Sequence, residues 1–503
     1  MTISETDIPS SDLIDDGYVD VATLKRSSVR GAAINFSTQI LRFIIQFAYQ
    51  IIIMRLLLPK DFGLVAMAAP VLIFVQMFAD FGLSQAIVQR KHITHKQLSF
   101  LFWFSTFVSA VLSLATIALA PLAALFYGEP KVTAIIMVLG ALLFSSGLQS
   151  QPTALLTRRM AYGKLAFIGF VSLGLGLGVG IISAMYGYGY WSLVINQAVT
   201  SFSSLFMSWK FAKWLPRRPE RVKDVKGLIG FGGNLTGFNA LNYFSRNLDN
   251  ILIGRVWGDA QLGLYDRAYK LLLLPLTQII WPLTSVTLPT LSRSLHDPAL
   301  YRRAFLRMFE SILLFTYPGI LFAMCTSQQL ILTVIGTRWL PVAPLFAVLA
   351  VSGLFAPIGN ATGWLYMSQD RTRGMRNWGI ISSTLLVVSF IIGLPWGPLG
   401  VAISYSSFII LQSPLGWWWA TREGPVNLRD ILNALLPHCW AGMATLLVVS
   451  VLQRFMSQGP LSLALLFVAA HATYAAMLAC LPGGRTLFVE LWAQVRHLGK
   501  IKT

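Results

Sequence analysis

A polar stripe runs along the first long apolar segment of this 503-residue chain. Asn35, Gln39, Arg42, Gln46 and Tyr49 follow one another at alternating intervals of four and three residues. That spacing is helical, so the five side chains project from one face of a helix. A guanidinium holds phosphate or carboxylate through two parallel hydrogen bonds. The stripe therefore indicates a helix face that binds an anion.

A second polar group lies in the segment "NALNYFSRNLDNILIGR", at positions 239–255. Asp249 stands three residues after Arg246, about one helical turn away, so the two side chains can pair. Such a pair is either a static bridge or a gate that opens when a substrate or an ion arrives. We expect Asp249 to act in coupling or gating, and we expect the substrate to be bound by Arg42, Arg246, Gln46, Asn242, Asn250 and Gln39.

The same polar residues have an alternative role, because amides commonly bond neighbouring helices inside a membrane. An arginine is harder to explain in that way, since a guanidinium has five donors to satisfy and insertion at a membrane centre costs about 2.5–3.5 kcal/mol. Arg255, Arg267 and Lys270 lie further along. We expect the two polar groups to line a central cleft, and we predict that these three residues border its outer end and attract an anionic head group, with interfacial anchoring as the alternative.

The composition decides which elements must hold these residues. Hydrophobic residues make up 55% of the chain and charged residues 12%, which is typical of a polytopic α-helical membrane protein. A helix needs about 20 apolar residues to cross a bilayer. Fourteen segments meet that need: 31–56, 62–84, 98–122, 132–155, 164–186, 190–212, 228–253, 265–290, 306–326, 343–367, 376–395, 398–420, 431–452 and 460–482. The stretch "LILTVIGTRWLP" (330–341) is too short, and we expect a cap or re-entrant piece there.

The basic residues indicate how these segments are oriented. The formal net charge is +19. With fourteen spans and both termini cytoplasmic, the cytoplasmic segments hold 29 of the 39 Lys and Arg residues, as the positive-inside rule requires. The charge therefore indicates membrane topology, and we expect no nucleic acid partner.

An internal repeat indicates two parallel lobes. "IIIMRLLLPKDFGLVAMA" (51–68) aligns with "ILIGRVWGDAQLGLYDRA" (251–268) at an offset of 200, including the Arg-x7-Gly-Leu pattern. An even number of spans separates the copies, so both run the same way. We predict a cytoplasmic disordered tail (1–29), an N-lobe (30–213), a basic cytoplasmic linker (214–226), a C-lobe (227–420), two added helices (421–482) and a cytoplasmic tail (483–503).

Catalytic and metal chemistry find no support in the sequence. Cys325, Cys439 and Cys480 show no CxxC spacing, and no set of a nucleophile and a base stands out. The run "LGLGLGVG" (173–180) follows no strand and lies within a span, where glycines let helices approach closely. We therefore expect a protein that is not an enzyme and has no cofactor.

Four segments resemble the Wzx-type polysaccharide flippases of the multidrug/oligosaccharidyl-lipid/polysaccharide exporter superfamily, closest to the colanic-acid and exopolysaccharide branch. They are "LLLPKDFGLVAMA" (56–68), "FADFGLSQAIVQR" (78–90), "NLDNILIGRVWGDAQLGLYDRAY" (247–269) and "PLTSVTLPTLSR" (282–293). The resemblance covers roughly 25–480. It implies an inner-membrane flippase for undecaprenyl-pyrophosphate-linked oligosaccharides, alternating access, coupling to an H+ or Na+ gradient, and membrane lipids and polysaccharide-assembly proteins such as a polymerase as partners.

Three other classes of protein remain as alternatives. An ion-coupled drug antiporter of the same superfamily would be expected to carry a carboxylate in its first lobe, whereas segment 31–56 has none and has Arg42. A membrane enzyme such as a polymerase or ligase would need a large outer loop, and the predicted outer loops are short. A membrane scaffold without transport activity is the third.

Overall fold

The structure is a computed structural model. It describes residue 39, residues 41–79, residue 87, residues 93–218, residues 226–482, and residues 484, 485, 487 and 488. Over 226–246 it describes the helical backbone and, among side chains, that of Tyr243. Within these residues the regular elements are α-helices and two short 3-10 helices, which confirms the predicted all-α class.

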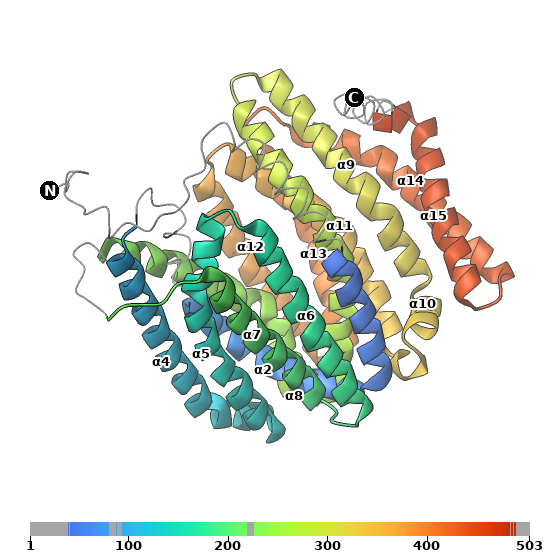
Figure 1. The fold of residues 1–503 in the computed structure, drawn as a ribbon. Helices are drawn as coiled ribbons and strands as arrows, with labels where there is room; N and C mark the ends of the chain where they lie inside the picture. Colours follow the sequence, from blue (N-terminus) through green and yellow to red (C-terminus); the bar gives the residue numbers. More distant parts are fainter. Residues whose placement is uncertain are drawn as a thin grey trace, which may run out of the picture. The chain divides into compact units, whose positions relative to one another are not determined.

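The helices follow the order of the predicted apolar segments (Figure 1). A helix over 41–56 comes first. It is followed by α2 (Pro59–Ala79), α4 (His95–Tyr127), α5 (Lys131–Arg158), α6 (Tyr162–Met185), α7 (Trp191–Ala212), α8 (Lys226–Arg293), α9 (Pro298–Cys325), α10 (Ser327–Val334), η3 (Thr337–Trp339), α11 (Val342–Ser368), α12 (Thr372–Gly393), η4 (Leu394–Trp396), α13 (Gly397–Thr421), α14 (Leu428–Phe455) and α15 (Pro460–Cys480).

Ten helices among the described residues are long and apolar enough to cross a membrane. Two of them each extend over two predicted spans: Thr372–Thr421 contains both of its spans in full, and Asn247–Arg293 contains one in full and the end of the one before it. In α8 the division falls at Gly258, whose φ of 80° and ψ of −176° interrupt the helix. The eight residues of α10 overlap the first part of the stretch 330–341, where a cap or re-entrant piece was expected. The count of fourteen spans stays a prediction.

Local sequence signals set several helix ends. Thr94 caps α4 by accepting a hydrogen bond from the Gln97 backbone N–H at 3.2 Å, while its own N–H donates to the Gln97 side chain at 3.1 Å. Asp297 caps α9 by accepting from the N–H groups of Ala299 and Leu300, both at 3.0 Å. These oxygens satisfy N–H groups that have no partner within the helix.

The chain divides into two compact units, Met1–Gly263 and Leu264–Thr503. In the first unit α4 packs on α5, and α6 packs on α7 (Figure 1). Small residues permit this close approach. A Cβ at Gly140 of α5 would lie 2.9 Å from Thr116 of α4, and a Cβ at Gly176 of α6 would overlap the Thr200 hydroxyl of α7. The glycines of the 173–180 run thus serve helix packing at Gly176, as predicted.

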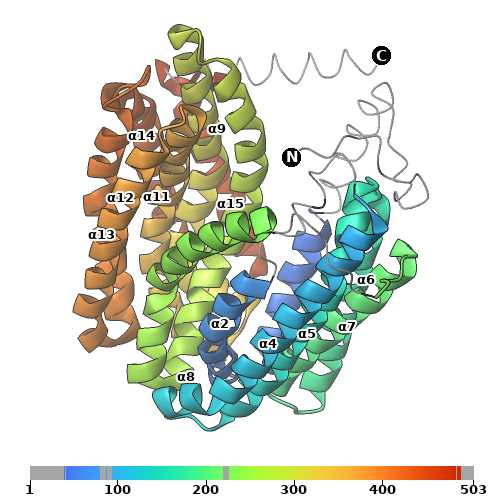
Figure 2. The same ribbon diagram turned by 90° about the vertical axis from the view of Figure 1, so that its left-hand side faces the viewer.

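In the second unit α13 packs against both α11 and α12, and α9 packs against α11, α14 and α15 (Figure 2). Polar contacts tie the ends of these helices together. The Tyr301 hydroxyl of α9 bonds the Ser368 hydroxyl of α11 at 2.6 Å. Arg302 of α9 forms an ion pair with Asp430 of α14.

The repeated glycines meet each other within the first unit. A Cβ at Gly63 would overlap the carbonyl oxygen of Asp259, and a Cβ at Gly263 would overlap the carbonyl oxygen of Pro59. The two contacts are related by the offset of 200, because Gly63 corresponds to Gly263 and Pro59 corresponds to Asp259. The first helical turn of α2 and the helical turn of α8 after Gly258 therefore approach with backbone against backbone, and this explains why glycine recurs at both positions of the repeat.

Candidate functional site

The residues of the first stripe have three different surroundings. Gln39 and Gln46 are exposed, Arg42 is half-buried and Tyr49 is buried. Asn35 lies outside the described residues. A single helix face thus presents two amides outward and places an arginine and a tyrosine against neighbouring helices.

Arg42 lies against α6. A Cβ at Gly169 would overlap Nη2 of Arg42 and would lie 2.7 Å from its Cζ. The Nε atom of Arg42 is buried and has no hydrogen-bond partner. A buried donor without an acceptor costs about 1–3 kcal/mol, so this atom is a place where an anion or an ordered water would stabilise the protein.

No carboxylate forms an ion pair with Arg42 among the residues that the structure describes. Its positive charge is therefore not neutralised by that part of the chain. A half-buried guanidinium of this kind can take a phosphate or a carboxylate from a ligand.

Tyr49 shows the alternative role that the sequence left open. Its hydroxyl accepts a hydrogen bond from the Asn196 amide of α7 at 2.6 Å. It also faces α6, because a Cβ at Gly180 would lie 3.1 Å from that hydroxyl. Tyr49 therefore bonds helices together, as polar residues in membrane helices commonly do.

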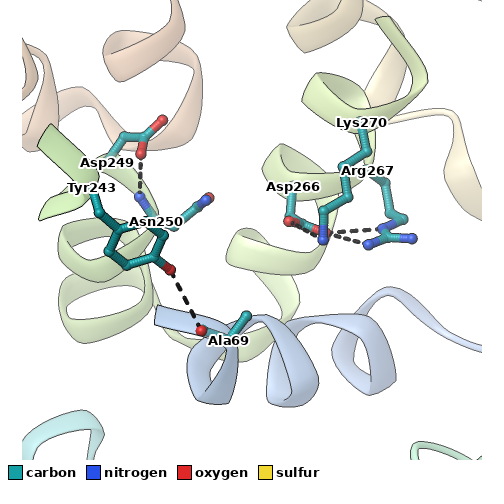
Figure 3. A network of polar contacts seen from close by, with 7 residues as sticks. All are labelled: Ala69, Tyr243, Asp249, Asn250, Asp266, Arg267 and Lys270. Atoms are coloured by element: carbon teal, nitrogen blue, oxygen red, sulfur yellow. Dashed lines mark hydrogen bonds and ion pairs between the residues drawn. The ribbon is translucent and has the colours of Figure 1, made fainter. Parts of the chain in front are cut away.

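The second polar group is described in part. The side chains of Asn242 and Arg246 lie outside the described residues, so the predicted pairing of Arg246 with Asp249 stays a prediction. Asp249 is buried and accepts a hydrogen bond from the Asn250 backbone N–H at 2.8 Å (Figure 3). The Asn250 side-chain oxygen is buried and has no hydrogen-bond partner.

The three residues predicted at the outer end of the cleft have two kinds of surroundings. Arg255 is exposed, and its Cζ lies 5.8 Å from the centroid of the Phe126 ring, within cation–π range. Arg267 and Lys270 instead share one carboxylate, that of Asp266 (Figure 3). Arg267 donates to Oδ2 at 3.0 Å from Nε and 2.5 Å from Nη2, and Lys270 Nζ lies 2.8 Å from Oδ1.

Asp266 is the residue of this group that the sequence reasoning missed. Its side chain is 5% exposed, that of Arg267 is 9% and that of Lys270 is 51%. The signal was present, because Asp266 and Lys270 stand four residues apart on a helix. Asp266 thus neutralises Arg267, and Lys270 is the most exposed member of the triad.

The sequence is similar to those of known polysaccharide biosynthesis proteins. A model of the family described as "Polysaccharide biosynthesis protein" matches residues 52–344. The teichuronic acid biosynthesis protein TuaB of Bacillus subtilis (strain 168) is 25% identical over 409 residues, which cover 80% of this chain and 85% of that protein. The lipopolysaccharide biosynthesis protein WzxC of Escherichia coli (strain K12) is 22% identical, with 85% and 87% covered. The succinoglycan biosynthesis transport protein ExoT of Rhizobium meliloti (strain 1021) is 22% identical, with 81% and 83% covered.

Solved structures share the fold. The lipid II flippase MurJ in an inward closed conformation has a TM-score of 0.68 at 14% identity, with 90% of this chain and 98% of that chain covered. An inward-facing multidrug resistance MATE family transporter has a TM-score of 0.54 at 13% identity, with 77% and 95% covered. At these identities the likeness establishes the helical fold, and the function has to be argued from the residues.

Proposed function

The chain belongs to the polysaccharide biosynthesis protein family, among the Wzx-type flippases, and on that premise we propose that it moves undecaprenyl-pyrophosphate-linked oligosaccharide repeat units across the cytoplasmic membrane. Relatives named for polysaccharide biosynthesis and transport, and a solved lipid II flippase of the same fold, support a lipid-linked substrate. The proposal includes alternating access driven by an H+ or Na+ gradient and release of the product to a polymerase.

We also propose that the protein lies in a bacterial inner membrane with both termini on the cytoplasmic side. The placement of 29 of the 39 Lys and Arg residues in the predicted cytoplasmic segments supports it. In that orientation the turns at Gly63 and Gly263 lie on the outer side of the membrane.

Arg42 is the observation that carries the proposal. A pyrophosphate offers several acceptor oxygens and at least two negative charges, and a guanidinium binds such a group bidentately. Arg42 has a buried Nε donor without an acceptor, and the described residues supply no carboxylate to neutralise it. An anionic head group satisfies both needs at once.

The test is export of surface polymer in a strain that lacks its own flippase gene and carries Arg42→Gln or Arg42→Lys. We expect Arg42→Gln to lower export tenfold or more, because a hydrogen bond to a charged group contributes about 1.5–3 kcal/mol. Arg42→Lys keeps the charge and loses the planar fork, so it should be intermediate. The free energy of unfolding in detergent should not fall in Arg42→Gln, because the buried Nε donor that it removes has no hydrogen-bond partner.

The control is Gln412→Ala, a change at a polar residue that bonds Ser382 at 2.7 Å between α12 and α13, far along the chain from the proposed site. Its export should match the wild type once membrane abundance is equalised. Wild-type export from Arg42→Gln at normal abundance would refute the role of Arg42. Normal polymer together with altered resistance to cationic drugs would favour the antiporter alternative.

A further inference from the structure

The place where Arg42 lies depends on one glycine of the neighbouring helix. Gly169 of α6 has no side chain, and the end of the Arg42 side chain occupies the volume that a side chain there would fill. A Cβ at Gly169 would overlap Nη2, would lie 2.7 Å from Cζ and would lie 3.5 Å from Nε. The guanidinium thus lies directly on the backbone of α6.

Other glycines of α6 have different neighbours, which makes Gly169 distinct. A Cβ at Gly163, Gly174 or Gly178 would meet no atom within 4 Å. A Cβ at Gly176 would meet Thr200 and Asn196 of α7, so that glycine serves helix packing. Among the described glycines of this helix, Gly169 is the one that faces a cationic side chain.

We propose that Gly169 is a positioning residue for Arg42: it seats the guanidinium against α6 at the place from which Arg42 binds the pyrophosphate of the lipid-linked substrate. The inference rests on the proposed function. The buried, unpartnered Nε supports it, because that donor lies beside Gly169 with its hydrogen-bonding capacity unused. Bidentate binding requires a defined guanidinium orientation, which this seat supplies.

The substitution Gly169→Ala tests the position of the Arg42 guanidinium separately from the folding of the protein. A contact shorter than 3.0 Å forces something to move, and here the obstructing atoms are the far end of a flexible side chain. The arginine moves while the α6 backbone stays in place. We therefore expect Gly169→Ala to misplace the guanidinium without unfolding the protein.

The experiment measures binding of undecaprenyl pyrophosphate to the purified full-length protein in detergent, together with thermal unfolding. Gly169→Ala should weaken binding about tenfold or more, with an unfolding temperature within a few degrees of the wild type. Gly174→Ala is the matched control, because it adds the same methyl group to the same helix in open space. It should bind as the wild type does.

Combination with Arg42 variants makes the test specific. In an Arg42→Ala background, Gly169→Ala should have no further effect on binding, because the side chain that it displaces is gone. In an Arg42→Lys background it should cost less than in the wild type, since lysine lacks the Nη2 atom that the methyl group would overlap. A merely structural role of Gly169 would persist in both backgrounds.

The results distinguish a failure of the inference about Gly169 from a failure of the proposed function. Loss of binding in Arg42→Ala with wild-type binding in Gly169→Ala overturns the seating inference and leaves the proposed function in place. Wild-type binding in Arg42→Ala overturns the proposed role of Arg42 and the inference with it. An equal loss from Gly169→Ala in the wild-type and Arg42→Ala backgrounds assigns Gly169 to helix packing and also overturns the inference.

Discussion

Two arginines in this chain carry the same charge in opposite circumstances. Arg267 is buried and gives two hydrogen bonds to Asp266, which also pairs with Lys270. Arg42 is half-buried, lies on a glycine and has an Nε donor without a partner. A charge that the chain itself neutralises serves structure, whereas an unsatisfied donor can serve a ligand. The comparison predicts that stability depends on the first arginine and transport on the second.

The largest change in stability is expected at the ion triad. Asp266→Asn removes the carboxylate that pairs with the buried Arg267, and breaking a buried ion pair in this way should lower the free energy of unfolding by about 3–5 kcal/mol. Thermal and denaturant unfolding in detergent would measure this loss. The control is Glu423→Gln, whose carboxylate side chain is 64% exposed and pairs with Arg371 at 3.3 Å. Solvent screens the exposed Glu423 carboxylate, so its loss should cost about 1 kcal/mol or less, and equal stability of the two variants would contradict the assignment of Asp266 as a buried counter-charge.

A smaller change is expected where the two repeats are alike. Gly63→Ala and Gly263→Ala each place a methyl group on a backbone carbonyl, which cannot move as a side chain can. Overpacking of this kind costs about 1–3 kcal/mol. Melting curves of both variants should shift downward by similar amounts, because the contacts are reciprocal.

Gly174→Ala is the control for both glycine variants. It has open space around it, and alanine is the better helix former by about 1 kcal/mol, so it should be at least as stable as the wild type. A large loss at one of the two repeated glycines with none at the other would show that the reciprocal contact is not what destabilises them.

The smallest change is expected within the stripe that also holds Arg42. Tyr49→Phe removes the acceptor of the 2.6 Å hydrogen bond from Asn196 and should cost about 0.5–1.5 kcal/mol of stability. Export of polymer should remain near wild type when abundance is equalised. Loss of export from Tyr49→Phe, with the protein folded, would instead extend the binding face along the stripe.

Much of the fold was predictable, because membrane helices are determined locally. Each requires about 20 apolar residues, and capping residues such as Thr94 and Asp297 stand at the ends where the structure uses them. The pattern also placed a break between two spans near Gly258, where the backbone adopts a left-handed φ that favours glycine. Orientation and the number of spans remain predictions from charge and length.

The polar residues were predicted by type, and their roles were not separable by sequence. Periodicity put Arg42 and Tyr49 on one helix face. The structure gives Tyr49 a partner on α7 and gives Arg42 a seat on α6. Which neighbour each side chain meets depends on how the helices pack, and that arrangement has no signal in the spacing of the stripe.

The sequence by itself determined that this chain is an all-helical membrane protein, that its two halves repeat a glycine at an offset of 200, and that its polar stripes contain arginine. Only the tertiary structure decided that Gly63 and Gly263 each meet the other turn's carbonyl, and that Gly169, unlike Gly174 or Gly178, lies under a guanidinium. The physical reason is that hydrophobicity and helical periodicity act within about 20 residues, whereas a close contact joins segments more than 100 residues apart and exists only once they pack.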